Sequence, residues 1–225
     1  QDFNFVIENL IIPIKIEAKK IEEGYTTMFI LPFASQKFSK EEIFKKVSNE
    51  VENLDVSTIM FLFRLKTALI TTPTWDKSIS LSGKKKEDAI QYTDKESNTN
   101  YLVFRKKVSE SEYCSIAYRL DADNDITEPH RKYVSSFFQT EVLSGVNLII
   151  DAPFVLATTR ETFDYDDPKN QELLQSIKAL FKDSIKTIKK LGILTAYTIS
   201  KMPLEENYGN DLAQILYEGF KEVMQ

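Results

Sequence analysis

Few residues in this chain have a type and spacing suited to chemistry. Cys114 is the only cysteine and His130 the only histidine among 225 residues, so a disulfide framework, a cysteine-rich zinc site and a paired-histidine metal motif are all excluded. Cys114 lies in a run with apolar residues at alternate positions, which predicts a buried side chain rather than a nucleophile. His130 follows a proline and precedes two cationic residues, which predicts a surface loop.

Glycine is too sparse for a phosphate-binding loop. The six glycines are at least ten positions apart, at Gly24, Gly83, Gly145, Gly192, Gly209 and Gly219. A Walker loop needs two glycines five positions apart, and a dinucleotide fingerprint needs three within six residues. Both kinds of loop are therefore excluded from this chain.

Two charged runs each have a simple explanation. Asp121, Asp123 and Asp125 have the spacing of calcium ligands, but an isoleucine replaces the required glycine at the sixth loop position and a lysine replaces the glutamate at the twelfth. This run predicts a solvated acidic turn. Lys84–Lys86, beside a glycine, predict the tip of a hairpin, and a contact with phosphate or nucleic acid is the alternative.

Arg160 is the residue best placed for ligand chemistry. It is one of five arginines, and it follows the apolar segment 152–157 and two threonines, with Glu161 next. A guanidinium on a loop held by a core strand can be directed at a ligand bound by another domain. The pattern alone favours the other interpretation, an ion pair with Glu161, Asp164 or Asp166.

Strand-like segments make up most of the elements that would position these residues. Short polar turns separate many of them, which predicts antiparallel pairing. The expected strands are Phe3–Ile7, Leu10–Ile16, Tyr25–Phe33, Thr67–Thr71, Ser78–Ser82, Ala89–Thr93, Tyr101–Val108, Tyr113–Leu120, Tyr133–Thr140, Val142–Ile150 and Ile193–Ile199.

Helices are predicted by capping residues and by apolar spacing. Ser39 and Glu42 form a capping box before one helix, and the apolar segment 57–66 suggests a short buried helix. Asp167 and a following proline begin a long amphipathic helix that ends at Gly192, and a terminal helix covers 212–224. The fold class expected is α+β in two layers, a mixed sheet containing a β-meander and backed by helices.

Charge and hydropathy indicate a protein with its own core. The net charge is −5 and no apolar stretch reaches the length of a membrane span. A single cysteine favours a reducing compartment, and we therefore expect a cytoplasmic protein. The chain begins at Gln1 without a signal-peptide pattern, which predicts an internal piece of a longer protein.

Four segments, in order, resemble the sacsin-type (Nov-domain) relatives of the heat-shock chaperone ATPases, which belong to the GHKL class. GYTTMFILPF begins at Gly24 and is similar to the strand that closes the ATPase domain. STIMFLFRLK begins at Ser57 and is similar to the apolar helix that follows. SSFFQTE begins at Ser135, and DAPFVLATTRETFDYDDPKNQ begins at Asp151 and gives the strongest match.

The resemblance implies the second module of a two-part ATPase. Residues 1–33 would close an upstream ATPase-type domain or form leading strands. Residues 34–225 would form a ribosomal-protein-like transducer fold, with a sheet of four or five strands and C-terminal helices. The upstream domain of the same polypeptide would bind ATP and Mg²⁺, so this chain alone would be neither an enzyme nor a metal site. By position, Arg160 would contact the γ-phosphate, with Thr159, Glu161 and Asn170 in support. The resemblance also allows a homodimer of the parent protein.

Two other functions remain open at this stage. One is a protein-interaction or scaffold module with no nucleotide role, in which Arg160 is a surface ion-pair partner. The other is a segment of a nucleic-acid-handling GHKL ATPase that uses Lys84–Lys86 and the face from Lys186 to Lys190, although the acidic net charge makes nucleic acid the weaker expectation.

Overall fold

The chain divides into two units, Gln1–Val47 and Ser48–Gln225. The structure, a computed structural model, describes residues 5–8, 12–15, 38–52, 54, 56–62, 65–94, 99–130, 132–159, 161–203 and 211–225. Within these residues, no helix has the length and apolar character needed to cross a membrane. The expected domain boundary after residue 33 lies outside the described residues and stays a prediction.

The first unit contains a small hairpin and most of one helix. Strands β1 (Phe5–Glu8) and β2 (Ile12–Lys15) pair in antiparallel fashion. Helix α1 (Lys40–Glu52) begins with the expected capping box, because the amide of Ser39 donates to Glu42 Oε2 at 2.8 Å and the amide of Glu42 donates to Ser39 Oγ at 3.2 Å. These bonds from Ser39 lower the pKa of Glu42. The third expected strand, Tyr25–Phe33, lies outside the described residues.

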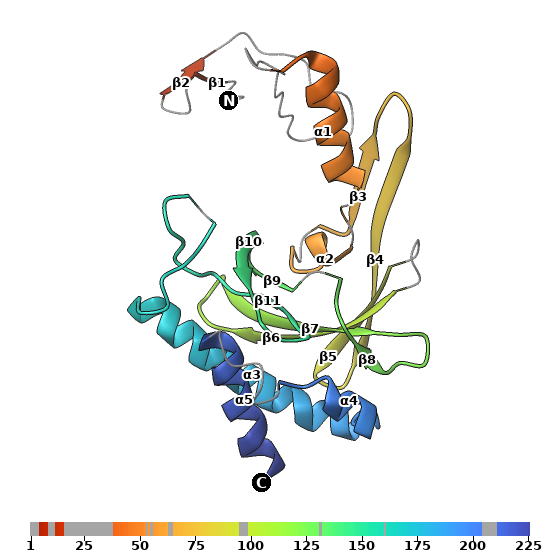
Figure 1. Ribbon diagram of the computed structural model, residues 1–225, viewed down its shortest axis with the longest axis vertical. Coiled ribbons are helices and arrows are strands. Elements are labelled where there is room, and N and C mark those ends of the chain that lie inside the picture. Colours follow the sequence, from red (N-terminus) through yellow and green to blue (C-terminus); the bar gives the residue numbers. More distant parts are fainter. Residues whose placement is uncertain are drawn as a thin grey trace. The chain divides into compact units, whose positions relative to one another are not determined.

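The second unit is built on one large sheet (Figure 1), ordered β10-β9-β11-β7-β6-β5-β4-β3, with β8 beside β7. All strand pairs are antiparallel except β9 with β11. The antiparallel meander expected from the short turns is therefore confirmed. The strands are β3 (Thr67–Thr71), β4 (Asp76–Lys86), β5 (Ala89–Asp94), β6 (Asn100–Lys107), β7 (Tyr113–Leu120), β8 (Ile126–Thr127), β9 (Tyr133–Ser136), β10 (Phe138–Leu143) and β11 (Ile149–Asp151).

The number of strands corrects one expectation. The resemblance implies four or five strands, whereas this sheet contains nine among the described residues. Hairpins at both ends account for much of the difference, because β3 with β4 extends one edge and β9 with β10 extends the other.

Each face of the sheet packs against a different set of helices. Figure 1 shows α3 (Pro168–Lys190), α4 (Ala196–Ser200) and α5 (Asp211–Met224) on one side of the sheet and α2 (Val56–Ile59) on the other. Along β6, Leu102 and Phe104 belong to the core cluster that contains α3, while Tyr101 and Val103 belong to the cluster that contains α2. This alternation follows from the two-residue period of a strand. The fold is thus α+β, a mostly antiparallel sheet backed by helices, as expected.

The long helix α3 has the boundaries that its caps predict. The Asp167 side chain accepts a hydrogen bond from the backbone of the first turn, Pro168 occupies that turn, and Gly192 follows the helix with φ of +74°. Ile177 and Phe181 are among its fully buried side chains. The terminal helix α5 also matches its expected range.

Three expected strands are wrong in extent or type. Phe137, with φ of 64°, divides the expected strand Tyr133–Thr140 into β9 and the start of β10. The segment Val142–Ile150 is interrupted where Ser144 Oγ donates to the carbonyls of Val146 and Leu148. The segment Ile193–Ile199 contains α4 instead, because Thr195 caps that helix by accepting a hydrogen bond from Thr198 N at 3.1 Å.

Candidate functional site

The described residues on either side of position 160, 156–159 and 161–163, are bonded to one another, and we call them the 156–163 loop. Leu156 and Phe163 form an antiparallel bridge, and Ala157 N donates to the Thr162 carbonyl at 2.8 Å. From the neighbouring β10, Glu141 N donates to the Glu161 carbonyl at 2.8 Å. Backbone hydrogen bonds therefore fix both arms of the loop.

Aromatic packing attaches the base of this loop to the core. The rings of Phe154 and Phe163 stack with centroids 4.1 Å apart and planes 4° apart, and Tyr165 leans on Phe163 at 4.8 Å. Phe154 and Phe163 are both buried in the cluster that contains α3. Stacked aromatic pairs contribute more than their buried area alone, by about 0.5–1.5 kcal/mol.

Asn170 joins the start of the loop to the first turn of α3. Its side chain is 0% exposed. Its Oδ1 accepts from Val155 N at 2.8 Å, and its Nδ2 donates to the carbonyls of Val155 at 3.0 Å and Asp164 at 2.8 Å. Asn170 N in turn donates to Asp167 Oδ1 at 3.1 Å. One buried amide thus holds the loop, the segment after it and the helix together.

The predicted site residues occupy different environments. Thr159 and Glu161 are exposed near the tip of the loop, where Glu161 N donates to Thr159 Oγ1 at 3.4 Å. Arg160 lies outside the described residues, so its predicted role stays a prediction. Asn170 is buried beneath the loop rather than beside Thr159 at its tip. Asp164, a predicted alternative partner for Arg160, accepts a hydrogen bond from Asp166 N at 2.9 Å.

The other residues considered for chemistry have structural roles. Cys114 is buried, and burial raises the pKa of its thiol to about 11, so a nucleophilic thiolate is disfavoured. His130 is exposed in a loop, as expected. Asp121 Oδ1 accepts from the amides of Asp123 and Asp125 at 3.0 and 2.9 Å, as in a solvated Asx turn. Across the described residues, no cluster of three or more His, Cys, Asp or Glu side chains could hold a metal ion.

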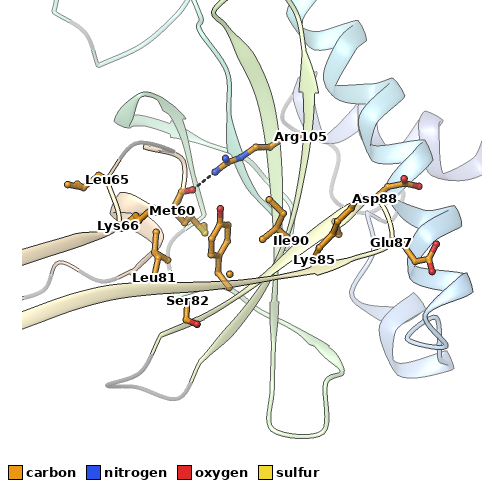
Figure 2. Close-up of a pocket in the computed structure, with 13 residues that line it drawn as sticks. Met60, Leu65, Lys66, Leu81, Ser82, Lys85, Glu87, Asp88, Ile90 and Arg105 are labelled. Atoms are coloured by element: carbon orange, nitrogen blue, oxygen red, sulfur yellow. Dashed lines mark hydrogen bonds between the residues drawn. The ribbon is translucent and has the colours of Figure 1, made fainter.

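The basic run lies beside an open groove (Figure 2) of about 960 Å³ over β4 and β5. Lys84–Lys86 are in β4, and the turn of the hairpin is at the next two residues. The groove has Lys66, Lys85 and Arg105 on its walls together with two acidic residues, Glu87 and Asp88. This mixture of charges gives no single-sign surface of the kind that nucleic acids favour.

The second basic face is partly neutralised. On α3, Lys186 Nζ lies 2.9 Å from Asp183, and Lys182 Nζ lies 2.6 Å from Glu222 of α5. The ion pair of Lys186 therefore reduces the positive charge of the face from Lys186 to Lys190, and Lys182 lies one turn before that face. These ion pairs weigh against the nucleic-acid interpretation.

Asp151 is a potential functional residue that sequence reasoning missed. It lies at the end of β11 and is 7% exposed, and its Oδ1 accepts from Phe137 N at 3.0 Å. Burial raises its pKa from the ordinary value of 3.8 to about 7. A signal was available in the sequence, because Asp151 is the one charged residue in the otherwise apolar segment 148–157.

The strand register places two further polar side chains on the same face of the sheet as Asp151. Arg105 of β6 pairs with Ser115 of β7, and Ser115 pairs with Asp151. Residues paired across neighbouring strands point to the same face of a sheet. This face is the one covered by α2, because Arg105 Nη2 donates to the carbonyl of Met60, as Figure 2 shows.

Stability should depend on pH through Asp151. Between about pH 4 and 7 the unfolded chain releases this proton while the folded protein keeps it, so stability from this group falls as pH rises. Asp151→Asn removes the titration and preserves an acceptor for Phe137 N. We expect the urea midpoint of the variant minus that of the natural protein to increase from pH 5 to pH 8. A gap that stays constant over this range would contradict a raised pKa.

The protein has an α+β fold, and the 156–163 loop is a surface loop held between the sheet and the long helix α3. No protein-family model and no solved structure matches the chain. The chain is similar to protein NO VEIN of Arabidopsis thaliana, with 25% identity over 191 residues that cover 77% of this chain and 7% of NO VEIN. The chain therefore spans only a small part of that relative's length.

Proposed function

We propose that this chain is the transducer-type module of a longer GHKL ATPase of the sacsin-like, Nov-domain kind. An upstream domain of the same polypeptide binds ATP with Mg²⁺, and Arg160 contacts the γ-phosphate. The chain alone does not hydrolyse ATP; it couples the nucleotide state to a conformational change in a chaperone-like, cytoplasmic protein.

Sequence similarity gives the first support. The four segments that resemble this family follow one another in the family's order between Gly24 and Gln171. The similarity to NO VEIN covers most of this chain but only 7% of that protein. A segment that recurs within a much longer protein is suited to work beside other domains.

The construction of the 156–163 loop is the observation that carries the proposal. Backbone bonds close its arms, stacked rings hold its base, and the buried amide of Asn170 ties it to α3. Thr159 and Glu161 nevertheless remain exposed. A contact with a ligand on another domain requires both properties, a rigid support and a free tip.

The chemistry of phosphoryl transfer explains why an arginine would be needed. Negative charge lies on the γ-phosphoryl oxygens, and a planar guanidinium donates to two of them at once. Because the γ-phosphate leaves after hydrolysis, the same contact reports whether triphosphate or diphosphate is bound. Asn170 acts in this scheme as a positioning residue.

Thiol labelling of the loop in the full-length protein tests this proposal. Thr159→Cys introduces a thiol at an exposed position, and we expect a non-hydrolysable ATP analogue to slow its modification at least about fivefold relative to ADP, because the docked loop is covered. Mass spectrometry of the loop peptide measures the rate.

Two sites in the chain provide controls for this labelling. Lys84→Cys, at an exposed position in β4, should react at the same rate with both nucleotides. Cys114 should stay unmodified, since it is buried and burial raises its pKa to about 11. Equal rates at Thr159→Cys with ATP analogue and ADP would favour a scaffold module with no nucleotide role.

A further inference from the structure

A second cavity, of about 440 Å³, lies on the face of the sheet that α2 covers. Its walls are mainly apolar and come from the segment after α2, the start of β7 and the turn between β9 and β10. The apolar residues are Phe61, Leu62, Leu65, Tyr113 and Phe137. Its volume falls in the range usual for small-molecule sites, about 300–1,000 Å³.

Asp151 supplies a buried carboxyl group to this cavity. It lines the cavity while being 7% exposed. Its single hydrogen bond within the described part of the chain joins Oδ1 to Phe137 N at 3.0 Å, so Oδ2 has no partner there. The Phe137 backbone has φ of 64°, and its amide donates to the Asp151 carboxyl. The Phe137 residue is 56% exposed and lines the cavity, so its ring lies at the mouth of the cavity. Among the described residues, Oδ2 is not one of the solvent-shielded atoms without a partner, so it is open to the cavity and is available to accept a hydrogen bond from a ligand.

Arg105 does not neutralise Asp151 directly. Its Nη2 donates to the Met60 carbonyl, and no ion pair within 4.0 Å joins Arg105 to Asp151. Ser115 lies between the two in the register of the sheet, and it also lines the cavity. The guanidinium still favours the ionised carboxyl, because it lowers the pKa of Asp151 against the larger effect of burial.

The remaining charged groups at the cavity already have partners within the protein. Glu112 lines the cavity, and its nearest cation, Lys169 of α3, lies 3.8 Å away and is half exposed. Tyr113 is at the wall, and Cys114 belongs to the core cluster on the opposite face of β7. Glu112 already accepts from Ser109 Oγ at 3.0 Å and pairs with Lys169, and Arg105 donates to the Met60 carbonyl, so the carboxyl of Asp151 is the group left to contact a ligand, and a cationic donor complements its ionised form.

We propose that this cavity binds a small molecule with a protonated amine on an apolar stem, the ammonium donating to Asp151 and Ser115 and the stem packing against Phe61, Leu62 and Phe137. This site is separate from the 156–163 loop and does not depend on the ATPase proposal. An ammonium bound there would satisfy the free carboxyl oxygen, and the mostly apolar walls would exclude water from the pair.

Binding should strengthen as pH rises. With a pKa of about 7, Asp151 is only partly ionised at neutral pH in the empty cavity. An ammonium favours the ionised form and so displaces the proton, whereas an alkyl amine with a pKa near that of lysine, about 10.4, stays charged. Affinity for the amine should therefore increase between pH 6 and pH 8.

A matched set of probes tests the site in the intact protein. At pH 8 we expect 4-phenylbutylamine to bind at least about tenfold more tightly than 4-phenylbutan-1-ol, as charged hydrogen bonds allow. Asp151→Asn should remove that preference. Asp94→Asn, at a similarly buried carboxyl at the end of β5, should preserve it. Calorimetric titration gives the affinities, and thermal melts show that each variant is folded.

Other results would overturn the proposal. They are equal affinity for amine and alcohol, tighter binding of 4-phenylbutyrate, an unchanged preference in Asp151→Asn, and no saturable amine binding up to about 10 mM. Leu65→Ala shortens one wall without touching the carboxyl, so it should weaken amine and alcohol alike. A loss confined to the amine in that variant would also count against this geometry.

Discussion

Asn170→Ala is expected to destabilise the protein by about 3–5 kcal/mol, because each buried polar group left unpaired costs about 1–3 kcal/mol. The substitution leaves the amide and carbonyl of Val155 and the carbonyl of Asp164 without their partner. Asn170 is 0% exposed, whereas Val155 and Asp164 are exposed residues, so the expected cost comes from the loss of three bonds made by one buried amide. Equilibrium urea unfolding measures the effect.

Asn147 provides a matched control for that substitution. Its Nδ2 makes one bond, to the Lys201 carbonyl at 3.0 Å, in a partly buried position. We expect Asn147→Ala to cost only about 1 kcal/mol. Asn170→Asp should resemble Asn170→Ala, since a carboxylate cannot donate to the two carbonyls that Asn170 contacts. Equal costs at Asn170 and Asn147 would contradict the bracing of the 156–163 loop by this amide.

Arg160→Ala in the full-length protein should lower ATP turnover at least about 100-fold, since electrostatic contacts to a transferring phosphoryl group have effects of this size or larger. Melting temperature should stay within about 2 °C, as for other surface changes. Arg160→Lys retains the charge but not the planar pair of donors, so its turnover should be intermediate. Steady-state phosphate release measures all three proteins.

A surface ion pair at Arg160 would give a different turnover result. If Arg160 forms only a surface ion pair with a neighbouring acidic residue, Arg160→Ala and Arg160→Lys will both turn over ATP at the natural rate. That result would leave the loop as a structural or interaction feature. A large drop in melting temperature would instead indicate that Arg160 stabilises this chain itself.

Local signals made several elements predictable from the sequence. Ser39 with Glu42 and Asp167 with Pro168 define helix starts through bonds within a few residues, and Gly192 ends α3 with a positive φ. The central strands contain runs of consecutive apolar residues, as two buried faces require. Such features depend on nearby residues alone, so one sequence is enough to place them.

The missed features depend on contacts between distant residues. A bond to Asp151 accompanies the turn at Phe137, fourteen positions earlier in the chain. The row formed by Arg105, Ser115 and Asp151 exists only because of the strand register. The expected number of strands was likewise wrong. The hairpins at the edges join the sheet through pairings that a family resemblance does not specify.

The candidate site was predictable only in part. Resemblance pointed to Asn170 as a supporting residue, and the buried bonds to Val155 and Asp164 provide a physical basis for such support. The proposed contact of Arg160 with phosphate involves a domain outside this chain, so no pattern within 225 residues can establish it. The cavity at Asp151 needed the fold before its charge balance could be judged.

Single-turnover hydrolysis by the full-length protein tests the central claim most directly. Enzyme in excess over ATP isolates the chemical step, while an ATP analogue measures nucleotide affinity separately. We predict that Arg160→Ala binds the analogue within about threefold of the natural protein but hydrolyses bound ATP at least about 100-fold more slowly. An unchanged single-turnover rate in Arg160→Ala would contradict a contact between this chain and the γ-phosphate.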